Sequence, residues 1–142
     1  MENTRIAFYR KWHGVPLEDW GWVVSPEYRG FQRAFKNLFK KIADDLGGEV
    51  VNFIASHYDE DVFIRRGDKY VNILHRNQLF NRSTPWLKSW CIRTAASATD
   101  YHGGTNNWVD YVSLVNEIDR LLGGNGKIED TNKFPHTMWL TY

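Results

Sequence analysis

The strongest hydrophobic pattern in the chain predicts a helix over residues 26–46. Apolar residues recur there at the spacing of one helix face, at Phe31, Phe35, Leu38, Phe39, Ile42 and Leu46. Ser25 is suited to cap the free amides of a first turn, and Pro26 suits the first helical position. Gly47 and Gly48 follow, and glycine readily adopts the left-handed conformation that ends a helix.

A second helical pattern is predicted from about Trp108 to Leu122. Asn107 is suited to cap it, with Asp110 three residues further on, as in a capping box. A glycine pair, Gly123-Gly124, would end this helix. Its apolar face comprises Tyr111, Leu114, Val115, Ile118 and Leu122.

The remaining patterned segments predict strands. They are Arg5–Trp12, Trp20–Val24, Val50–Tyr58, Val62–Arg66, Tyr70–His75, Trp90–Thr94 and an edge strand at 138–142. We expect the first two to form a hairpin, a turn at residues 59–61, a tight turn at Gly67-Asp68, and a loop over 95–107. This order predicts a single α+β domain over residues 1–142. It has one antiparallel sheet of about four to six strands, with two helices packed on one face.

Composition narrows the class of protein. The formal net charge is +1, so whole-molecule charge favours neither a nucleic-acid binder nor an acidic DNA mimic. One cysteine, Cys91, excludes an intramolecular disulfide and fits a reducing compartment. No run approaches the roughly 20 apolar residues of a membrane span, and the N-terminus lacks the apolar core of a signal peptide. We therefore expect a cytoplasmic protein.

The best-defined surface feature is a row of cations on the first predicted helix. Arg29, Arg33, Lys36 and Lys40, here called the basic stripe, fall within an arc about 60° wide, opposite the apolar face. The stripe is roughly 16 Å long at the rise of an α-helix. It suits the phosphates of a nucleic acid or an acidic patch on a protein; the alternative is an ordinary solvated helix face.

A polar loop follows the last strand of the predicted meander. Asp100, Tyr101, His102 and Asn106 crowd hydrogen-bonding groups around a glycine pair, 103–104. The sequence leaves three interpretations open: a binding loop, an active-site loop, or a connection that caps the second helix. Neither the dinucleotide fingerprint nor the P-loop spacing is present, so we do not expect nucleotide binding.

Other candidate chemistry is sparse. The five histidines have no metal-ligand spacing, and we expect neither a metal nor a cofactor. Cys91 is a candidate nucleophile with His75 or His102 as base, although a buried core cysteine is the simpler interpretation. Among seven tryptophans, Trp86 follows a polar Thr-Pro pair and is the ring that we expect to be exposed as an interface anchor.

Two stretches carry a resemblance. They are 63–73, and 92–95 together with 100–107. About a third of the chain thus resembles small accessory proteins of phages, plasmids and conjugative elements of bacteria. The resemblance implies a bacterial host cytoplasm and a role against host defence, as in anti-CRISPR proteins. It implies no catalytic residues.

These observations give three functional hypotheses. The first is a non-catalytic binding protein of a mobile element, an anti-CRISPR inhibitor that docks on a Cas effector. The second is a nucleic-acid-binding module that uses the basic stripe and exposed rings. The third is a small enzyme that acts through the Asp100–His102 loop.

Overall fold

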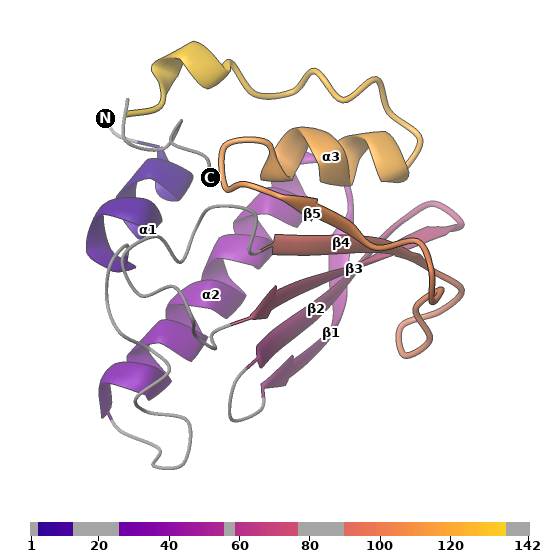
Figure 1. The fold of residues 1–142 in the computed structure, drawn as a ribbon, viewed down its shortest axis with the longest axis horizontal. Helices are drawn as coiled ribbons and strands as arrows, with labels where there is room; N and C mark the ends of the chain where they lie inside the picture. The colour runs from indigo at the N-terminus through magenta and orange to yellow at the C-terminus, as the bar shows by residue number, and fades with distance from the viewer. Residues whose placement is uncertain (1–2, 13–25, 56–58, 77–89, 136–142) are drawn as a thin grey trace.

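The fold is an open antiparallel sheet with helices on one face (Figure 1). The structure, a computed structural model, describes residues 3–12, 26–55, 59–76 and 90–135. Its elements are α1 (Thr4–Trp12), α2 (Pro26–Asp45), β1 (Glu49–Ala55), β2 (Asp59–Arg66), β3 (Lys69–Arg76), β4 (Trp90–Ala95), β5 (Asn107–Val109), α3 (Leu114–Leu121) and the short 3-10 helix η2 (Thr131–Lys133). The predicted α+β class is therefore confirmed.

The five strands follow one another in space in chain order, β1-β2-β3-β4-β5, and every neighbouring pair is antiparallel. Cross-strand pairs such as Ile64↔Val71 and Ile73↔Ile92 place alternate residues of the central strands on the face that carries the helices. A register shift in β1 between Val50 and Asn52 leaves Val51 as a bulge. The sheet thus has a helix-covered face and a second face, defined by the intervening residues.

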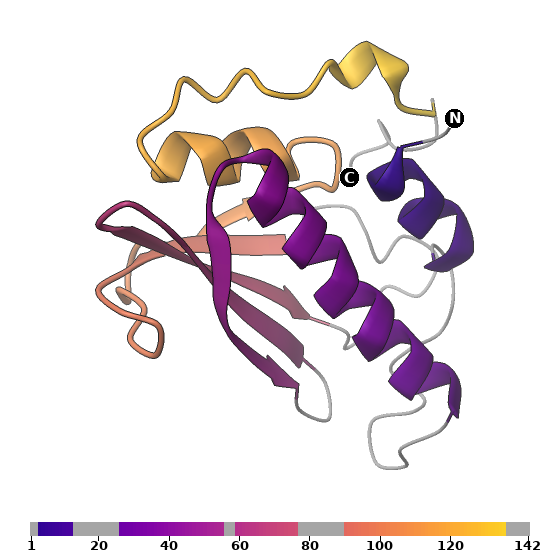
Figure 2. The ribbon, with the colours of Figure 1, turned by 180° about the vertical axis from the view of Figure 1, so that it is seen from behind.

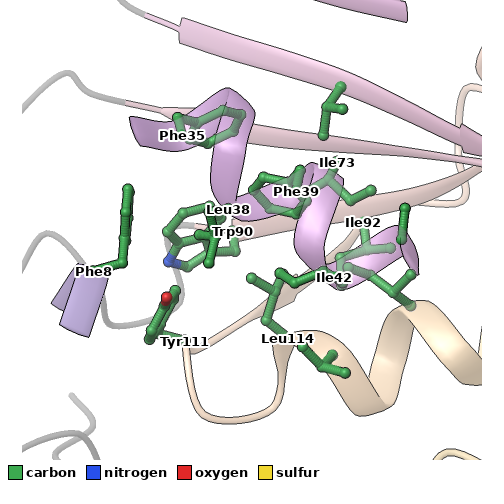
Figure 3. Close-up of a cluster of buried hydrophobic side chains, with 14 of the residues drawn as sticks. Phe8, Phe35, Leu38, Phe39, Ile42, Ile73, Trp90, Ile92, Tyr111 and Leu114 are labelled. Atoms are coloured by element: carbon green, nitrogen blue, oxygen red, sulfur yellow. The ribbon is translucent and has the colours of Figure 1, made fainter. Parts of the chain in front are cut away.

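The core lies between α2, α3 and the covered face of the sheet (Figures 2 and 3). Trp90 is fully buried and stacks on Phe35, with ring centroids 5.9 Å apart and planes 5° apart. The predicted apolar faces of both helices are buried, which confirms the periodicity from which they were read: Phe31, Phe35, Leu38, Phe39, Ile42, Leu46, Tyr111, Leu114, Val115, Ile118 and Leu122. Gly47, at φ 73°, ends α2 as predicted.

The N-terminal segment corrects the sequence prediction. Residues 5–12 form helix α1 and not a strand, and Asn3 Oδ1 accepts a hydrogen bond from the Ile6 amide at the helix start. The short alternation of apolar residues also fits a helix face, because the buried positions recur at helical spacing: Arg5, Ile6, Phe8, Tyr9 and Trp12. The predicted partner strand, 20–24, lies outside the described residues, as do Ser25, Trp86 and the predicted edge strand at 138–142.

Three boundaries also differ from the prediction. Residues 59–61 belong to β2, where they pair with the end of β3, and do not form a turn. Residues 107–109 form the short edge strand β5, so α3 begins at Leu114 and not near Trp108. Asp110 does not complete a capping box; its Oδ1 accepts a hydrogen bond from the Ser113 amide at 2.9 Å. Pairing with β4 therefore overrides the helical pattern at the start of that segment.

Among the described residues, no helix combines the length and apolarity that a membrane crossing needs.

Candidate binding surfaces

The basic stripe lies on the exposed face of α2. All four of its cations, Arg29, Arg33, Lys36 and Lys40, are exposed. Within the described ranges none of them forms an ion pair. The Lys36 ammonium lies 5.8 Å from the centroid of the Phe53 ring in β1, so this part of the stripe lies beside the first strand. The fold therefore leaves these charges available to an external partner.

The exposed face of α2 changes sign near its C-terminus. Asp44 and Asp45 are exposed there, and the last turn contains no cation. Lys41 Nζ contacts Asp45 Oδ1 at 2.8 Å, and this hydrogen bond with the carboxylate raises the pKa of Lys41. A partner that runs along the whole helix meets cations first and carboxylates at the end.

The polar loop after β4 is a hairpin extension and not a helix cap. The Ala96 amide donates to the Asp100 carbonyl at 2.8 Å, and the His102 amide donates to the Thr94 carbonyl at 2.8 Å. His102 Nδ1 also lies 2.9 Å from the Thr94 hydroxyl oxygen. Asp100, His102 and Asn106 are exposed. The loop is thus fixed largely by its own backbone bonds.

Tyr101 closes a polar cluster on the second face of the sheet. Its ring lies over the Arg93 guanidinium, with 3.5 Å from the carbon Cζ to the ring centroid. Arg93 Nε donates to Asn72 Oδ1 at 2.9 Å, and Asn72 Nδ2 donates to Asp61 Oδ1 at 2.6 Å. Asn52 Nδ2 in β1 donates to the Ala98 carbonyl at 2.8 Å. This hydrogen bond joins the loop to the first strand of the sheet. Buried polar groups here are largely satisfied by one another.

Exposed apolar side chains are also found on the second face. Tyr101 is 45% exposed, Trp108 40% and Ile54 48%. Trp108 pairs with Cys91 across β4 and β5, and Ile54 pairs with Asp61 across β1 and β2, so both lie on the face away from α2. These side chains come from both edges of the sheet.

The structure separates the predicted site residues into two groups. Arg29, Arg33, Lys36 and Lys40 lie on the helical side of the molecule. Tyr101 lies on the second face, and Asp100, His102 and Asn106 belong to the loop that begins after β4. The stripe and the loop therefore belong to different surfaces.

The candidate nucleophile pair is separated as well. His75 packs on the covered face against Trp90, with ring centroids 4.3 Å apart, and lies 3.7 Å from the Glu60 carboxylate. Cys91 follows Trp90 in β4, so its side chain points to the opposite face, where it is buried. The sheet itself stands between this thiol and the His75 imidazole. His102 is exposed and contacts Thr94.

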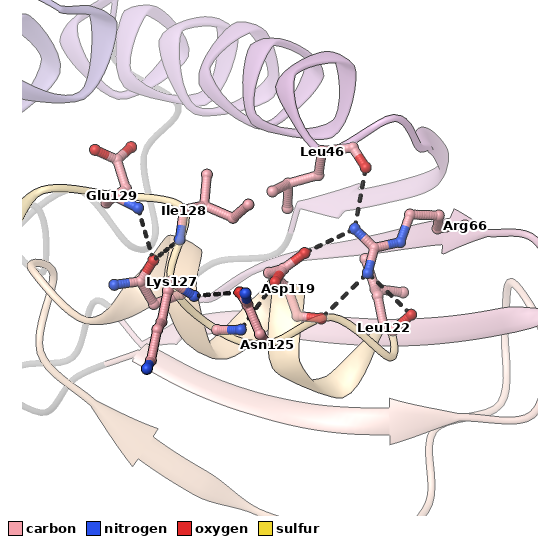
Figure 4. A network of polar contacts seen from close by, with 10 residues as sticks. Leu46, Arg66, Asp119, Leu122, Asn125, Lys127, Ile128 and Glu129 are labelled. Atoms are coloured by element: carbon pink, nitrogen blue, oxygen red, sulfur yellow. Dashed lines mark hydrogen bonds and ion pairs between the residues drawn. The ribbon is translucent and has the colours of Figure 1, made fainter.

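Arg66 carries a network that sequence patterns did not indicate (Figure 4). Its guanidinium donates to the Leu46 carbonyl after α2 at 3.1 Å and to the Leu122 carbonyl after α3 at 3.0 Å. It also pairs with Asp119 Oδ1 at 2.8 Å. Burial would raise the pKa of Asp119, but Arg66 and the Gly126 amide together outweigh burial and hold that pKa below its ordinary value. A single arginine thus joins the ends of two helices.

Arg5 has an equivalent role at the N-terminus. Its buried guanidinium lies between the rings of Tyr111 and Phe134, 4.7 Å from each centroid, and 3.3 Å from the Glu129 carboxylate. The Tyr111 hydroxyl donates to the Arg5 carbonyl at 3.0 Å, and burial raises the pKa of that phenol well above its ordinary value. Arg5 therefore ties α1 to the segment before α3 and to the C-terminal segment.

A cavity of about 500 Å³ opens between α1, α2 and α3. Arg5 and Lys41 line the cavity together with two acidic residues. Arg5 pairs with Glu129, and Lys41 pairs with Asp45. Its cationic side chains therefore already have internal counterions.

Comparison with protein-family models, with curated proteins and with solved structures gave no match. Among the described residues, no group of three or more histidine, cysteine, aspartate or glutamate side chains is arranged to hold a metal ion.

Proposed function

We propose that the protein is a non-catalytic binding protein whose basic stripe docks on an acidic surface of a protein partner. One observation carries the proposal: the four stripe cations are exposed and have no ion-pair partner in the described part of the chain. Charges arranged in this way set the specificity and the rate of association with a surface of opposite sign.

A protein fits this face better than a nucleic acid does. A polyanion that follows α2 would meet Asp44 and Asp45 on the exposed side of its last turn, and like charges repel. The whole chain adds little long-range attraction, because its formal net charge is +1. A protein surface carries both signs of charge and is able to complement both parts of the helix.

The resemblance in residues 63–73, 92–95 and 100–107 supplies the class of partner. We propose a Cas effector of a bacterial host, bound by an accessory protein of a mobile element. On this proposal the protein inhibits by occupying a surface of the effector and performs no chemistry.

The test measures binding to a panel of purified Cas effectors by biolayer interferometry, followed by a DNA-cleavage assay. Reversing charge with Arg33→Glu and Lys36→Glu together should weaken binding at least about tenfold and relieve inhibition. The matched control is Lys127→Glu with Lys133→Glu, the same charge change at two exposed positions outside α2. We expect that control to bind within about twofold of the wild type.

Two outcomes would reject the proposal. If the wild type binds none of the effectors, the Cas partner is wrong. If binding is lost equally in the control pair, net charge and not the stripe is responsible. A gel shift with DNA or RNA, with affinity that falls steeply with salt, would instead support the nucleic-acid alternative.

A further inference from the structure

We propose that β1 binds an extended acidic segment of the partner by strand addition, with the basic stripe beside it. The inference rests on the proposed function for the sign of the partner's charge. It adds the mode of recognition: backbone hydrogen bonds to the sheet edge, combined with ion pairs to α2.

The outer edge of β1 offers the backbone groups that strand addition needs. β1 is the first strand of the sheet and pairs with β2 (Figure 1). In an antiparallel pair, alternate residues direct their N–H and C=O groups away from the neighbouring strand. Over the described part of the chain, no backbone hydrogen bond joins β1 to any segment other than β2.

The sequence of β1 does little to protect that edge. Residues 50–55 contain no charged residue and no proline, which are the usual means of preventing edge pairing. The bulge at Val51 interrupts the register on one side, but four residues, 52–55, continue beyond it in regular pairing with β2. Ile54 in this stretch is 48% exposed. The edge is therefore a suitable template for a further strand.

The charges beside the edge select the occupant. The Lys36 ammonium lies 5.8 Å from the centroid of the Phe53 ring, so the middle of the stripe lies close to β1. Side chains on one face of an added strand repeat about every 6.8 Å, and the rise from Lys36 to Lys40 is about 6 Å. Acidic residues at alternate positions of the added strand would therefore match successive stripe cations.

The same charges argue against a second copy of this chain as the occupant. In a two-fold β1–β1 pairing, Lys36 of each copy would lie beside the shared interface, because Lys36 is close to β1. It would bring two basic stripes together, and like charges at an interface are costly. A nucleic acid has no peptide backbone with which to extend the sheet. An acidic segment of another protein satisfies both the edge and the stripe.

The probe is a fluorescein-labelled peptide of roughly nine residues, enough for one strand, in which glutamate alternates with valine. Binding to the full chain is measured by fluorescence anisotropy. Two further peptides carry backbone N-methyl groups, one on its glutamates and the other on its valines. Alternate residues of a strand face opposite edges, so only one of these peptides loses the donors that face β1.

We expect the unmodified peptide to bind and one methylated peptide to bind at least about tenfold more weakly, since that peptide loses several backbone hydrogen bonds at once. The other methylated peptide should bind within about threefold of the unmodified one. Equal binding of all three peptides would overturn strand addition, and so would no binding of the unmodified peptide at millimolar concentration.

Charge reversal separates this inference from the proposed function. The Arg33→Glu, Lys36→Glu protein should lose the glutamate–valine peptide and gain a lysine–valine peptide of the same length. If charge reversal weakens peptide binding but methylation has no effect, the stripe binds acidic partners without using β1. If charge reversal changes neither peptide binding nor effector binding, the proposed function itself fails.

Discussion

The cations on the outer face of α2 and the arginines beside the sheet are the same kinds of residue in opposite settings. Arg33 and Lys36 are exposed and lack an ion pair in the described structure. Arg66 donates four hydrogen bonds, and Arg93 is buried beneath Tyr101. A cation with internal partners holds elements together, whereas an exposed cation without them contributes little to the stability of the fold. Substitutions in the two regions should therefore affect different properties.

The largest effect on stability is expected at Arg66. Arg66→Ala would leave the Asp119 carboxylate, whose side chain is 4% exposed, without its counterion, and would free carbonyls at the ends of α2 and α3. Breaking such a pair costs about 3 kcal/mol. Arg65→Ala is the matched control, because Arg65 pairs with Glu49 at the surface and should contribute at most about 0.5 kcal/mol. Urea denaturation measures both, and similar values would contradict the distinction.

Arg93 should give the next largest effect. Arg93→Met keeps much of the apolar volume but removes the donors to Asn72 Oδ1, which is buried. An unsatisfied buried acceptor costs about 2 kcal/mol. Tyr101→Phe keeps the ring over the guanidinium and should change the free energy of unfolding by less than about 0.5 kcal/mol.

A double substitution refines that result. Adding Asn72→Leu to Arg93→Met removes the acceptor together with its donor. The pair should cost less than the sum of the two single substitutions, because the two side chains interact directly. Additive costs would mean that the Arg93–Asn72 contact contributes little to stability.

A smaller effect is expected from pH through Asp119. The pKa of this carboxyl is lowered in the folded state from the ordinary value of 3.8, so ionised Asp119 stabilises the fold. That contribution is complete above the ordinary pKa and decreases as pH falls through it toward the lower folded pKa. Thermal unfolding followed from neutral to acidic pH should show this loss in the wild type. Asp119→Asn should be less stable at neutral pH and should lack this component of the acid dependence.

How far the sequence anticipates these results depends on the distance between interacting residues. The buried face and the exposed cations of α2 follow from one helical repeat that extends over some 20 positions, so both could be predicted. Helix α1 is short, and the spacing of its apolar residues fits either a strand or a helix. The contacts that distinguish the two are distant in sequence, such as those of Arg5 with Tyr111 and Phe134. The partners of Arg66 lie 20, 53 and 56 residues away in sequence, and no local pattern indicates them. The hairpin bonds of the loop likewise depend on β4, although its composition correctly indicated a polar, exposed segment.

The smallest effect on stability is expected at Asp44, where the stripe ends. Its carboxylate lies at the negative end of the α2 dipole, in a last turn without a cation. Asp44→Lys should raise the free energy of unfolding by at most about 0.5 kcal/mol.

The same change extends the stripe by one turn and should have a larger effect on binding than on stability. A protein partner that matches both signs of charge along α2 should lose affinity, because its own cation would face Lys and not Asp. A polyanion should bind more tightly. Its affinity should also fall more steeply with salt, as expected for roughly one further phosphate contact. Tighter binding to DNA or RNA together with unchanged binding to the effector would contradict the proposed match between the mixed charges of α2 and a protein surface.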